Sequence, residues 1–268
     1  MKNFGPKFIL TFLLSIYWPH WGWASAEECI ELYDKEKYEQ ALPACTKAAE
    51  QGVADAQFKL GVMYANGQGV PQNDKQALHW ITKAAEQGDT EVQTLLGLMY
   101  DMGLGVPQNL KEAFHWYSKA AEQGLAIAQS NVGWRYAVGR GVPQNEKQAL
   151  HWYTKAAEQG DAAAQYGLGV MYAKGRGVPQ SEKQAFHWIA KAAEQGLAIA
   201  QLNVGLRYAR GEGLPKNFVK GYAWLNVAAS QGDIRAVTNR DLIESKMTPN
   251  QIEKAQALSE VYHKKYIN

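Results

Sequence analysis

The chain has 268 residues and a nearly balanced charge, with 28 basic and 26 acidic side chains and a formal net charge of +2. Such a balance gives no support for nucleic-acid binding or for broad attraction to a membrane surface, because both favour strongly basic patches. A chain of this length usually forms one or two domains, unless it is built from repeats.

Residues 1–26 have the composition of a secretory signal peptide. Lys2 and Lys7 form a positive start, an apolar run covers residues 8–17, and residues 24–26 provide an A-x-A cleavage site. The alternative is an uncleaved membrane anchor, but the apolar run is shorter than the roughly 20 residues that a spanning helix needs. We therefore predict export to the periplasm or beyond the cell. The mature chain would be uncharged overall, with 26 acidic residues balanced by as many basic ones.

A single cassette recurs along the chain with a fixed period. Each copy contains a Gly-x-Gly-Val/Leu-Pro segment and ends in Lys-Ala-Ala-Glu-Gln-Gly or a close variant. A period of 20–50 residues indicates a solenoid, in which helical units stack in one dimension and offer an extended surface. The glycines that mark the period are 36 residues apart: Gly52, Gly88, Gly124, Gly160, Gly196 and Gly232.

Each copy is predicted to form two helices. In the first copy, apolar residues at helical spacing predict a first helix over about residues 54–65. Gly67 and Pro71 end that helix, and Asn73 begins the second one in a variant of the capping box. A glycine inside a helix costs about 1 kcal/mol, so its recurrence at one place predicts the close approach of another helix. These glycines are Gly61, Gly97, Gly133, Gly169 and Gly205.

This pattern resembles the Sel1-like repeat, a relative of the tetratricopeptide repeat. The matching segments are A-x-x-x-L-G-x-x-Y-x-x-G-x-G-V at 56–70, A-x-x-W at 77–80 and K-A-A-E-Q-G at 83–88. The resemblance implies an all-α fold, a right-handed α-solenoid of stacked antiparallel helix pairs. Five copies fill residues 53–232, and we number them one to five: 53–88, 89–124, 125–160, 161–196 and 197–232.

Both ends of the array are predicted to be caps. Residues 27–52 form a shortened helix pair, and residues 233–268 form a lone first helix followed by a last helix that begins at Thr248 with Pro and Gln in its first turn. Cys29 and Cys45 lie on the two helices of the N-terminal cap. An oxidising compartment favours a disulfide between them, worth about 3 kcal/mol. The alternative is a pair of buried thiols.

The first helices are predicted to carry the partner-binding residues. In the related tetratricopeptide arrays these helices line the concave side, and alignment on Leu60, Gly61 and Tyr64 transfers the binding positions to places that vary between copies. We predict that a protein or peptide lies along this groove, although the same residues could instead pack against the neighbouring first helix. One place holds Phe58, Thr94, Ser130, Tyr166 and Leu202, and another holds Val62, Leu98, Trp134, Val170 and Leu206. Phe58, Leu98, Trp134 and Tyr166 are the predicted contacts, because large apolar and aromatic groups often anchor interfaces.

Two polar pairs recur in copies three and five. Asn131 and Arg135 lie one helical turn apart, as do Asn203 and Arg207. These pairs could offer two stations to a carboxylate or to a peptide backbone. The alternative, which we favour, is duplication of a block of two repeats in which each arginine is paired with a neighbouring glutamate.

Neither metal binding nor catalysis is indicated. A histidine recurs once per copy on the second helix, but ligands must converge at about 2.1 Å from one ion, whereas stacked helices are about 8–10 Å apart. Acids such as Asp55, Glu91 and Asp101 are predicted to be solvated. The sequence has no H-E-x-x-H, G-x-S-x-G, P-loop, S-x-x-K or K-T-G motif, so we predict neither catalytic residues nor a cofactor. The histidines are His79, His115, His151 and His187.

These observations favour a non-enzymatic exported scaffold that binds a protein or peptide partner. One alternative is a hydrolase acting on cell-wall material or β-lactams, as has been suggested for some cysteine-rich relatives of the repeat. Another is a purely structural spacer. A groove that holds a peptide would favour the scaffold, whereas a pocket with converging polar groups would favour the enzyme.

Overall fold

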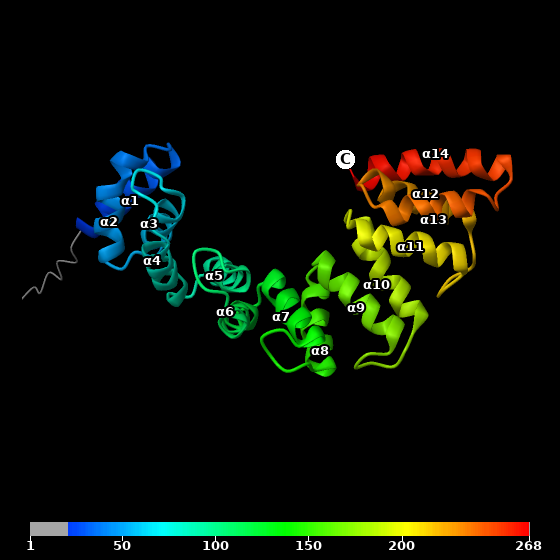
Figure 1. The fold of residues 1–268 in the computed structure, drawn as a ribbon, viewed down its shortest axis with the longest axis horizontal. Helices are drawn as coiled ribbons and strands as arrows, with labels where there is room; N and C mark the ends of the chain where they lie inside the picture. Colours follow the sequence, from blue (N-terminus) through cyan, green and yellow to red (C-terminus); the bar gives the residue numbers. More distant parts are fainter. Residues whose placement is uncertain (1–20, 268) are drawn as a thin grey trace, which may run out of the picture. The chain divides into compact units, whose positions relative to one another are not determined.

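A computed structural model describes residues 21–267 of the chain, and every regular element in that range is an α-helix (Figure 1). The predicted all-helical fold of stacked helix pairs is confirmed. Contacts divide the chain after Ala84 into two compact units, and each is described by itself. Residues 1–20 of the predicted signal peptide lie outside the described range.

The first unit contains the N-terminal cap and most of copy one. Its helices are α1 (Trp21–Asp34), α2 (Tyr38–Glu50), α3 (Ala54–Asn66) and α4 (Asp74–Glu86), the last of which extends past the boundary. Helix α1 begins at Trp21, within the predicted signal peptide, and continues through the predicted cleavage site. Ser25 and Ala26, the last two residues before the predicted cleavage bond, are buried in this helix.

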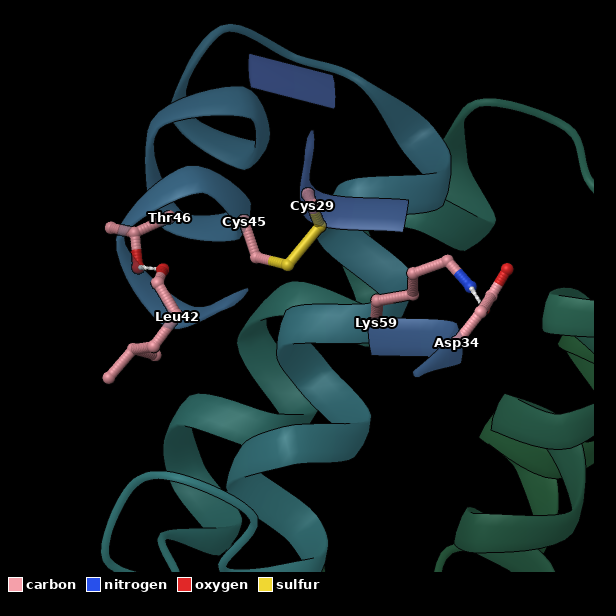
Figure 2. Close-up of a disulfide and its surroundings, with 6 residues drawn as sticks. All are labelled: Cys29, Asp34, Leu42, Cys45, Thr46 and Lys59. Atoms are coloured by element: carbon pink, nitrogen blue, oxygen red, sulfur yellow. Dashed lines mark hydrogen bonds and ion pairs between the residues drawn. A yellow bond between two sulfur atoms is a disulfide. The ribbon is translucent and has the colours of Figure 1, made fainter. Parts of the chain in front are cut away.

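The predicted disulfide is present in this first unit. Cys29 of α1 and Cys45 of α2 are bonded, with their Cα atoms 4.7 Å apart, and both are buried (Figure 2). An ion pair of 3.1 Å between Lys59 on α3 and Asp34 at the end of α1 lies beside it. The cap is therefore held together covalently and is tied to copy one by a charged contact.

The second unit continues the array to the C-terminal end. Its last two helices pack on α12, where Trp224 lies 4.8 and 5.0 Å from the rings of Tyr262 and Tyr266 on the last helix. The apolar side of the final repeat is thereby covered. The helices of this unit are α5 (Thr90–Met102), α6 (Leu110–Glu122), α7 (Ala126–Val138), α8 (Glu146–Glu158), α9 (Ala162–Lys174), α10 (Glu182–Glu194), α11 (Ala198–Arg210), α12 (Phe218–Ser230), α13 (Ile234–Glu244) and α14 (Pro249–Tyr266).

Helix ends follow the predicted capping signals. The Asn145 side chain accepts a hydrogen bond from the Gln148 amide at the start of α8, which satisfies one of the free donors there. Gly139 ends α7 in the left-handed conformation, with φ 74°. At α14 the predicted capping box is complete, since Thr248 accepts from the Gln251 amide and the Gln251 side chain accepts from the Thr248 amide.

The recurring glycine inside each first helix does mark a close helix contact. A Cβ atom on Gly133 of α7 would lie 2.9 Å from Cδ1 of Tyr153 on α8. The equivalent glycine of copy four, Gly169, would place its Cβ 2.5 Å from Cγ1 of Ile189. The two helices of a repeat therefore approach so closely that only glycine fits between them.

A buried glutamine network, which the sequence analysis missed, joins successive repeats. The Gln129 side chain donates to the carbonyl of Ala121 at the end of the preceding helix, at 3.1 Å, and accepts from the Gln159 side chain at 2.8 Å. Equivalent bonds form around Gln93, Gln165 and Gln201. Each glutamine thus satisfies backbone and side-chain groups at the ends of two second helices. The sequence could have revealed this network, because a glutamine recurs at the same place in every copy.

Candidate partner-binding site

A cavity of about 560 Å³ opens between the first helices α7 and α9, in copies three and four. Helix α7 contributes Asn131 and Trp134, and helix α9 contributes Tyr166 and Val170. Three of the residues predicted to bind a partner, Asn131, Trp134 and Tyr166, therefore line a single site. Its volume is within the usual range for ligand pockets, about 300–1,000 Å³. We call this cavity the α7–α9 pocket.

The floor of the α7–α9 pocket is the phenol ring of Tyr153, which extends from α8 beneath both first helices. A Cβ atom on Gly167 of α9 would lie 2.7 Å from Cζ of Tyr153. At this place copies three and five carry Asn131 and Asn203, so copy four lacks a side chain where its neighbours have one. Burial, assisted by the nearby Asp161 carboxylate, raises the pKa of Tyr153 above its ordinary value of 10, which already keeps the hydroxyl protonated at neutral pH.

The two aromatic walls differ in their surroundings. Trp134 is 40% exposed, and the guanidinium of Arg140 lies 5.7 Å from its ring centroid. Tyr166 is half-buried, and its hydroxyl accepts a hydrogen bond of 3.3 Å from the Asn203 side chain on α11. Burial raises the pKa of Tyr166. Tyr166 is thus held in place by copy five, whereas Trp134 is partly exposed and has guanidinium groups as neighbours.

Three charged residues line the α7–α9 pocket. Glu146 and Arg176 lie 4.0 Å apart and form a loose ion pair. Asp161 caps α9, where its Oδ1 atom accepts from the Ala164 amide at 2.7 Å. No cation pairs with Asp161 within residues 21–267, so this carboxylate supplies the net charge of the pocket lining.

The other predicted contacts are not among the residues that line this pocket. Phe58 is half-buried on α3, in the first unit. Leu98 occupies in α5 the place that Trp134 occupies in α7 and is equally exposed, at 39%, but it does not line the cavity. Asn203 meets the site only through its bond to Tyr166. The middle of the predicted surface, Asn131, Trp134 and Tyr166, thus lines one cavity.

Arg135 is buried within the array and is not open to solvent. Its side chain is 1% exposed, with Nη2 2.8 Å from Oδ1 of Asp101 on α5 and its guanidinium 4.8 Å from the centroid of the Tyr117 ring. Asp101, expected on a solvated face, is 18% exposed and also binds Arg140 at 3.2 Å. These side chains form an ion pair between repeats, so we leave Arg135 out of the proposed surface.

Arg207 is buried in the same way but binds a different carboxylate. Its Nη1 atom donates to Oε2 of Glu182, at the start of α10, at 2.5 Å. This hydrogen bond lowers the pKa of the Glu182 carboxyl. Pairing with a neighbouring glutamate was the favoured alternative for the two arginines, and Arg207 fits it. Arg207 is likewise omitted from the proposed surface.

The histidine series on the second helices is exposed, and each ring lies edge-on to the next residue, a tryptophan. His151, for example, lies 5.3 Å from the ring of Trp152. Among the described residues no group of three or more His, Cys, Asp or Glu is placed to hold a metal ion. None of the helices described here is both long and apolar enough to cross a membrane.

Comparison with known proteins identifies the repeat. The family model for the Sel1 repeat matches five consecutive segments, 54–89, 90–125, 126–161, 162–197 and 198–233, each one residue later than the copies defined above. A search of curated protein sequences found no match to the chain.

Two solved structures resemble most of the chain. A protective antigen of uropathogenic Escherichia coli is 37% identical over 92% of this chain, with a TM-score of 0.80, and this chain covers 56% of its length. A Sel1 repeat protein from Oxalobacter formigenes is 36% identical over 90% of this chain and 99% of its own, with a TM-score of 0.76. The chain thus matches the second protein almost end to end, but spans little more than half of the first.

Proposed function

Because the chain belongs to the Sel1 repeat family, we propose that it is an exported, non-enzymatic scaffold that binds a protein or peptide partner on the face of its first helices. Sel1 repeat proteins typically mediate protein–protein interactions and are generally not catalysts. In this chain the binding face would centre on the α7–α9 pocket. Asn131, Trp134 and Tyr166 would be the residues that touch the partner.

The exposure of Trp134 beside a cavity is the observation that carries this proposal. A tryptophan that packs in a core loses most of its solvent contact, whereas Trp134 keeps 40% of its surface open. Buried aromatic anchors dominate the energies of many interfaces. An exposed indole next to an unfilled apolar space provides such an anchor before the partner arrives.

Export is supported by two independent features. Residues 1–26 have the composition of a signal peptide, and the Cys29–Cys45 disulfide is consistent with a location outside the reducing cytoplasm. Both cysteines follow the proposed cleavage site, so the mature protein would retain them. Fractionation of the native host followed by N-terminal sequencing tests this part, with Glu27 expected as the first residue.

The binding proposal is tested by removing the two aromatic walls. The double variant Trp134→Ala/Tyr166→Ala should weaken partner binding by about thirtyfold or more, the effect of losing a hot spot worth about 2 kcal/mol. Leu98→Ala is the matched control, because Leu98 has the same place and exposure one repeat earlier. The partner is first captured by a photo-crosslinking residue at position 134, with position 98 as its control.

The same double variant is also examined by thermal unfolding. Retained stability with lost binding supports the proposal. If the variant unfolds early, the two rings belong to the core of the array. If it binds its partner at full strength, the partner does not use this face.

A further inference from the structure

We infer that the α7–α9 pocket selects a basic side chain, lysine or arginine, of a partner segment. The inference rests on the proposed function and specifies its chemistry. It follows from the combination of three aromatic rings and one unpaired carboxylate around a single cavity. The apolar walls would receive the aliphatic stem of the basic residue, and the charged head would lie near Asp161.

The three aromatic rings around the cavity come from three different helices. Trp134 lies on α7, Tyr153 on α8 and Tyr166 on α9, and all three line the same space. The face of an aromatic ring carries negative electrostatic potential, so it attracts an ammonium or guanidinium group, most strongly where solvent is excluded. Aromatic rings supplied by three different helices can bound a cation from several sides.

The net negative charge of the pocket lining also favours a cation. Glu146 and Arg176 offset each other at 4.0 Å, which leaves the Asp161 carboxylate as the net charge. Asp161 lies close enough to Tyr153 to help raise the pKa of its phenol. A cation in the pocket would therefore meet a carboxylate and a neutral hydroxyl, both of which can accept its hydrogen bonds.

The other nearby arginines do not line the pocket and are bound to carboxylates outside it, with Arg135 and Arg140 sharing Asp101. Arg207 is held by Glu182 at 2.5 Å, and Arg235, which lies near Tyr166, is held by Asp233 at 2.7 Å. Arg140 is bound to Asp101 at 3.2 Å. The Asp161 carboxylate thus remains the one lining charge without a counter-ion in the described structure.

The residues around Asp161 differ from those at the equivalent places two repeats earlier. An aspartate recurs at the place of Asp161 in copy two, as Asp89, where it caps α5 in the same way by accepting from the amides of Glu91 and Val92. Asp89 does not line the α7–α9 pocket. The glycine that opens the pocket floor, Gly167, has Leu95 as its counterpart in copy two. Asp161 therefore caps its helix and lines the α7–α9 pocket, whereas Asp89 caps α5 and does not line this pocket.

This pair of aspartates gives a matched test. Asp161→Asn and Asp89→Asn each remove a charge and keep a good N-cap, since asparagine caps helices as well as aspartate does. The probe is a set of short peptides selected from a randomised phage-displayed library against the whole mature protein. The selected peptides are then synthesised, together with versions in which the basic residue is replaced by norleucine.

Selected peptides should carry lysine or arginine beside an apolar residue. Replacement of the basic residue by norleucine should weaken binding about tenfold, as for a cation that loses ring and carboxylate contacts. Asp161→Asn should weaken the basic peptide by a similar factor and abolish its advantage over the norleucine peptide, whereas Asp89→Asn should change neither. High salt should reduce the same advantage, because the interaction is between charges.

Two other outcomes would overturn the inference and separate it from the proposed function. If peptides bind, and lose binding in Trp134→Ala/Tyr166→Ala, but tolerate norleucine or Asp161→Asn, the pocket takes an apolar group: the inference fails while the scaffold proposal stands. If no peptide is selected, or if the aromatic double variant binds as well as the wild type, both fail.

Discussion

Copies three and five have almost the same first helix, yet their buried arginines bind different residues. Both copies contain Leu-Ala-Ile-Ala-Gln-x-Asn-Val-Gly-x-Arg-Tyr. In copy three Arg135 reaches back to Asp101 near the end of α5, whereas in copy five Arg207 reaches the first residue of α10, Glu182. Arginines with nearly identical local sequences thus pair with a carboxylate on the first helix of the preceding repeat in one case and on its second helix in the other.

The difference shows that the preceding copy decides how an arginine is paired. Copy two has an acid at 101 and Leu110 at the start of its second helix, so Arg135 has one carboxylate available. Copy four has Ala173 at the first of these places and Glu182 at the second, so Arg207 has the other. In copy four the equivalent of Arg135 is Met171, and in copy three the equivalent of Asp101 is Ala137. This apolar pair requires no compensating charge.

The largest expected effect comes from removing the carboxylate that pairs with Arg135. Asp101→Ala, which installs the residue found at this place in every other copy, should lower the free energy of unfolding by about 3–5 kcal/mol, because it leaves a buried charge without its partner. Chemical denaturation measures this. The double variant Asp101→Ala/Arg135→Met should recover most of the loss, since it recreates the Ala137–Met171 combination. Equal stability of the single variant and the wild type would mean that Arg135 does not depend on Asp101.

Two glycine variants test whether α7 and α11, the helices that carry the arginines, pack equally closely on the second helices of their repeats. Gly133→Leu should destabilise the chain by at least about 1–3 kcal/mol, because its Cβ would overlap Tyr153 and overpacking costs about that much. Gly205→Leu should lower the free energy of unfolding by about as much, because a Cβ atom at Gly205 would lie 2.7 Å from Cγ of Leu225.

Only Gly133→Leu should also disturb the α7–α9 pocket, because Tyr153 forms its floor. Thermal unfolding and partner affinity measured on both variants separate the two effects. An unchanged melting temperature for Gly133→Leu would show that this glycine does not separate the helices.

The ion pair of copy five should have a smaller effect, and one that depends on pH. Glu182 has a lowered pKa when folded, so its pairing stabilises the fold above its ordinary value of 4.5 and is lost as pH falls through the lowered value. Because the Glu182 side chain is 40% exposed, solvent screens the pair, and Glu182→Gln should cost only about 1 kcal/mol at neutral pH. Unfolding measured across acidic pH should show the two proteins converging below pH 4.5; a constant difference would contradict this origin.

Arg135→Met is expected to have the smallest effect. Met occupies the equivalent place in copies one, two and four, and replacement of a buried ionic group by an apolar one of similar size is often nearly neutral. Asp101 would keep its 3.2 Å pairing with Arg140. We expect a change of less than about 1 kcal/mol in the free energy of unfolding. A loss as large as that of Asp101→Ala would show that the arginine itself, and not the balance of charge, stabilises the junction.

Local signals sufficed to predict most helix ends. The turn glycines have the left-handed conformation that their type allows, Thr248 and Gln251 form the complete capping box, and Cys29 bonds to Cys45. The start of α1, at Trp21, lies within the segment predicted to be a signal peptide. Each of the correct predictions depends on residues close together in the chain, where the geometry of one turn determines the contact.

The candidate site was only half predictable. Trp134, Tyr166 and Asn131 were identified because variable places on a repeated framework stand out, but Tyr153 and Asp161 were not, since one is a second-helix core residue and the other a cap. Their part in the pocket depends on Gly167 having no side chain, and on how three helices meet around that gap. Such a cavity is a property of juxtaposed elements rather than of any single segment.

By itself, the sequence determined the period, the helix pairs, the helix caps, the helix-contact glycines and the disulfide, because these follow from residues within one repeat or one cap. Tertiary structure alone decided which carboxylate each arginine meets, how Gln129 and Gln159 connect repeats, and where the array opens a pocket. The physical reason is distance along the chain. These contacts join side chains 25 or more residues apart, and packing selects one partner among several that the sequence offers equally.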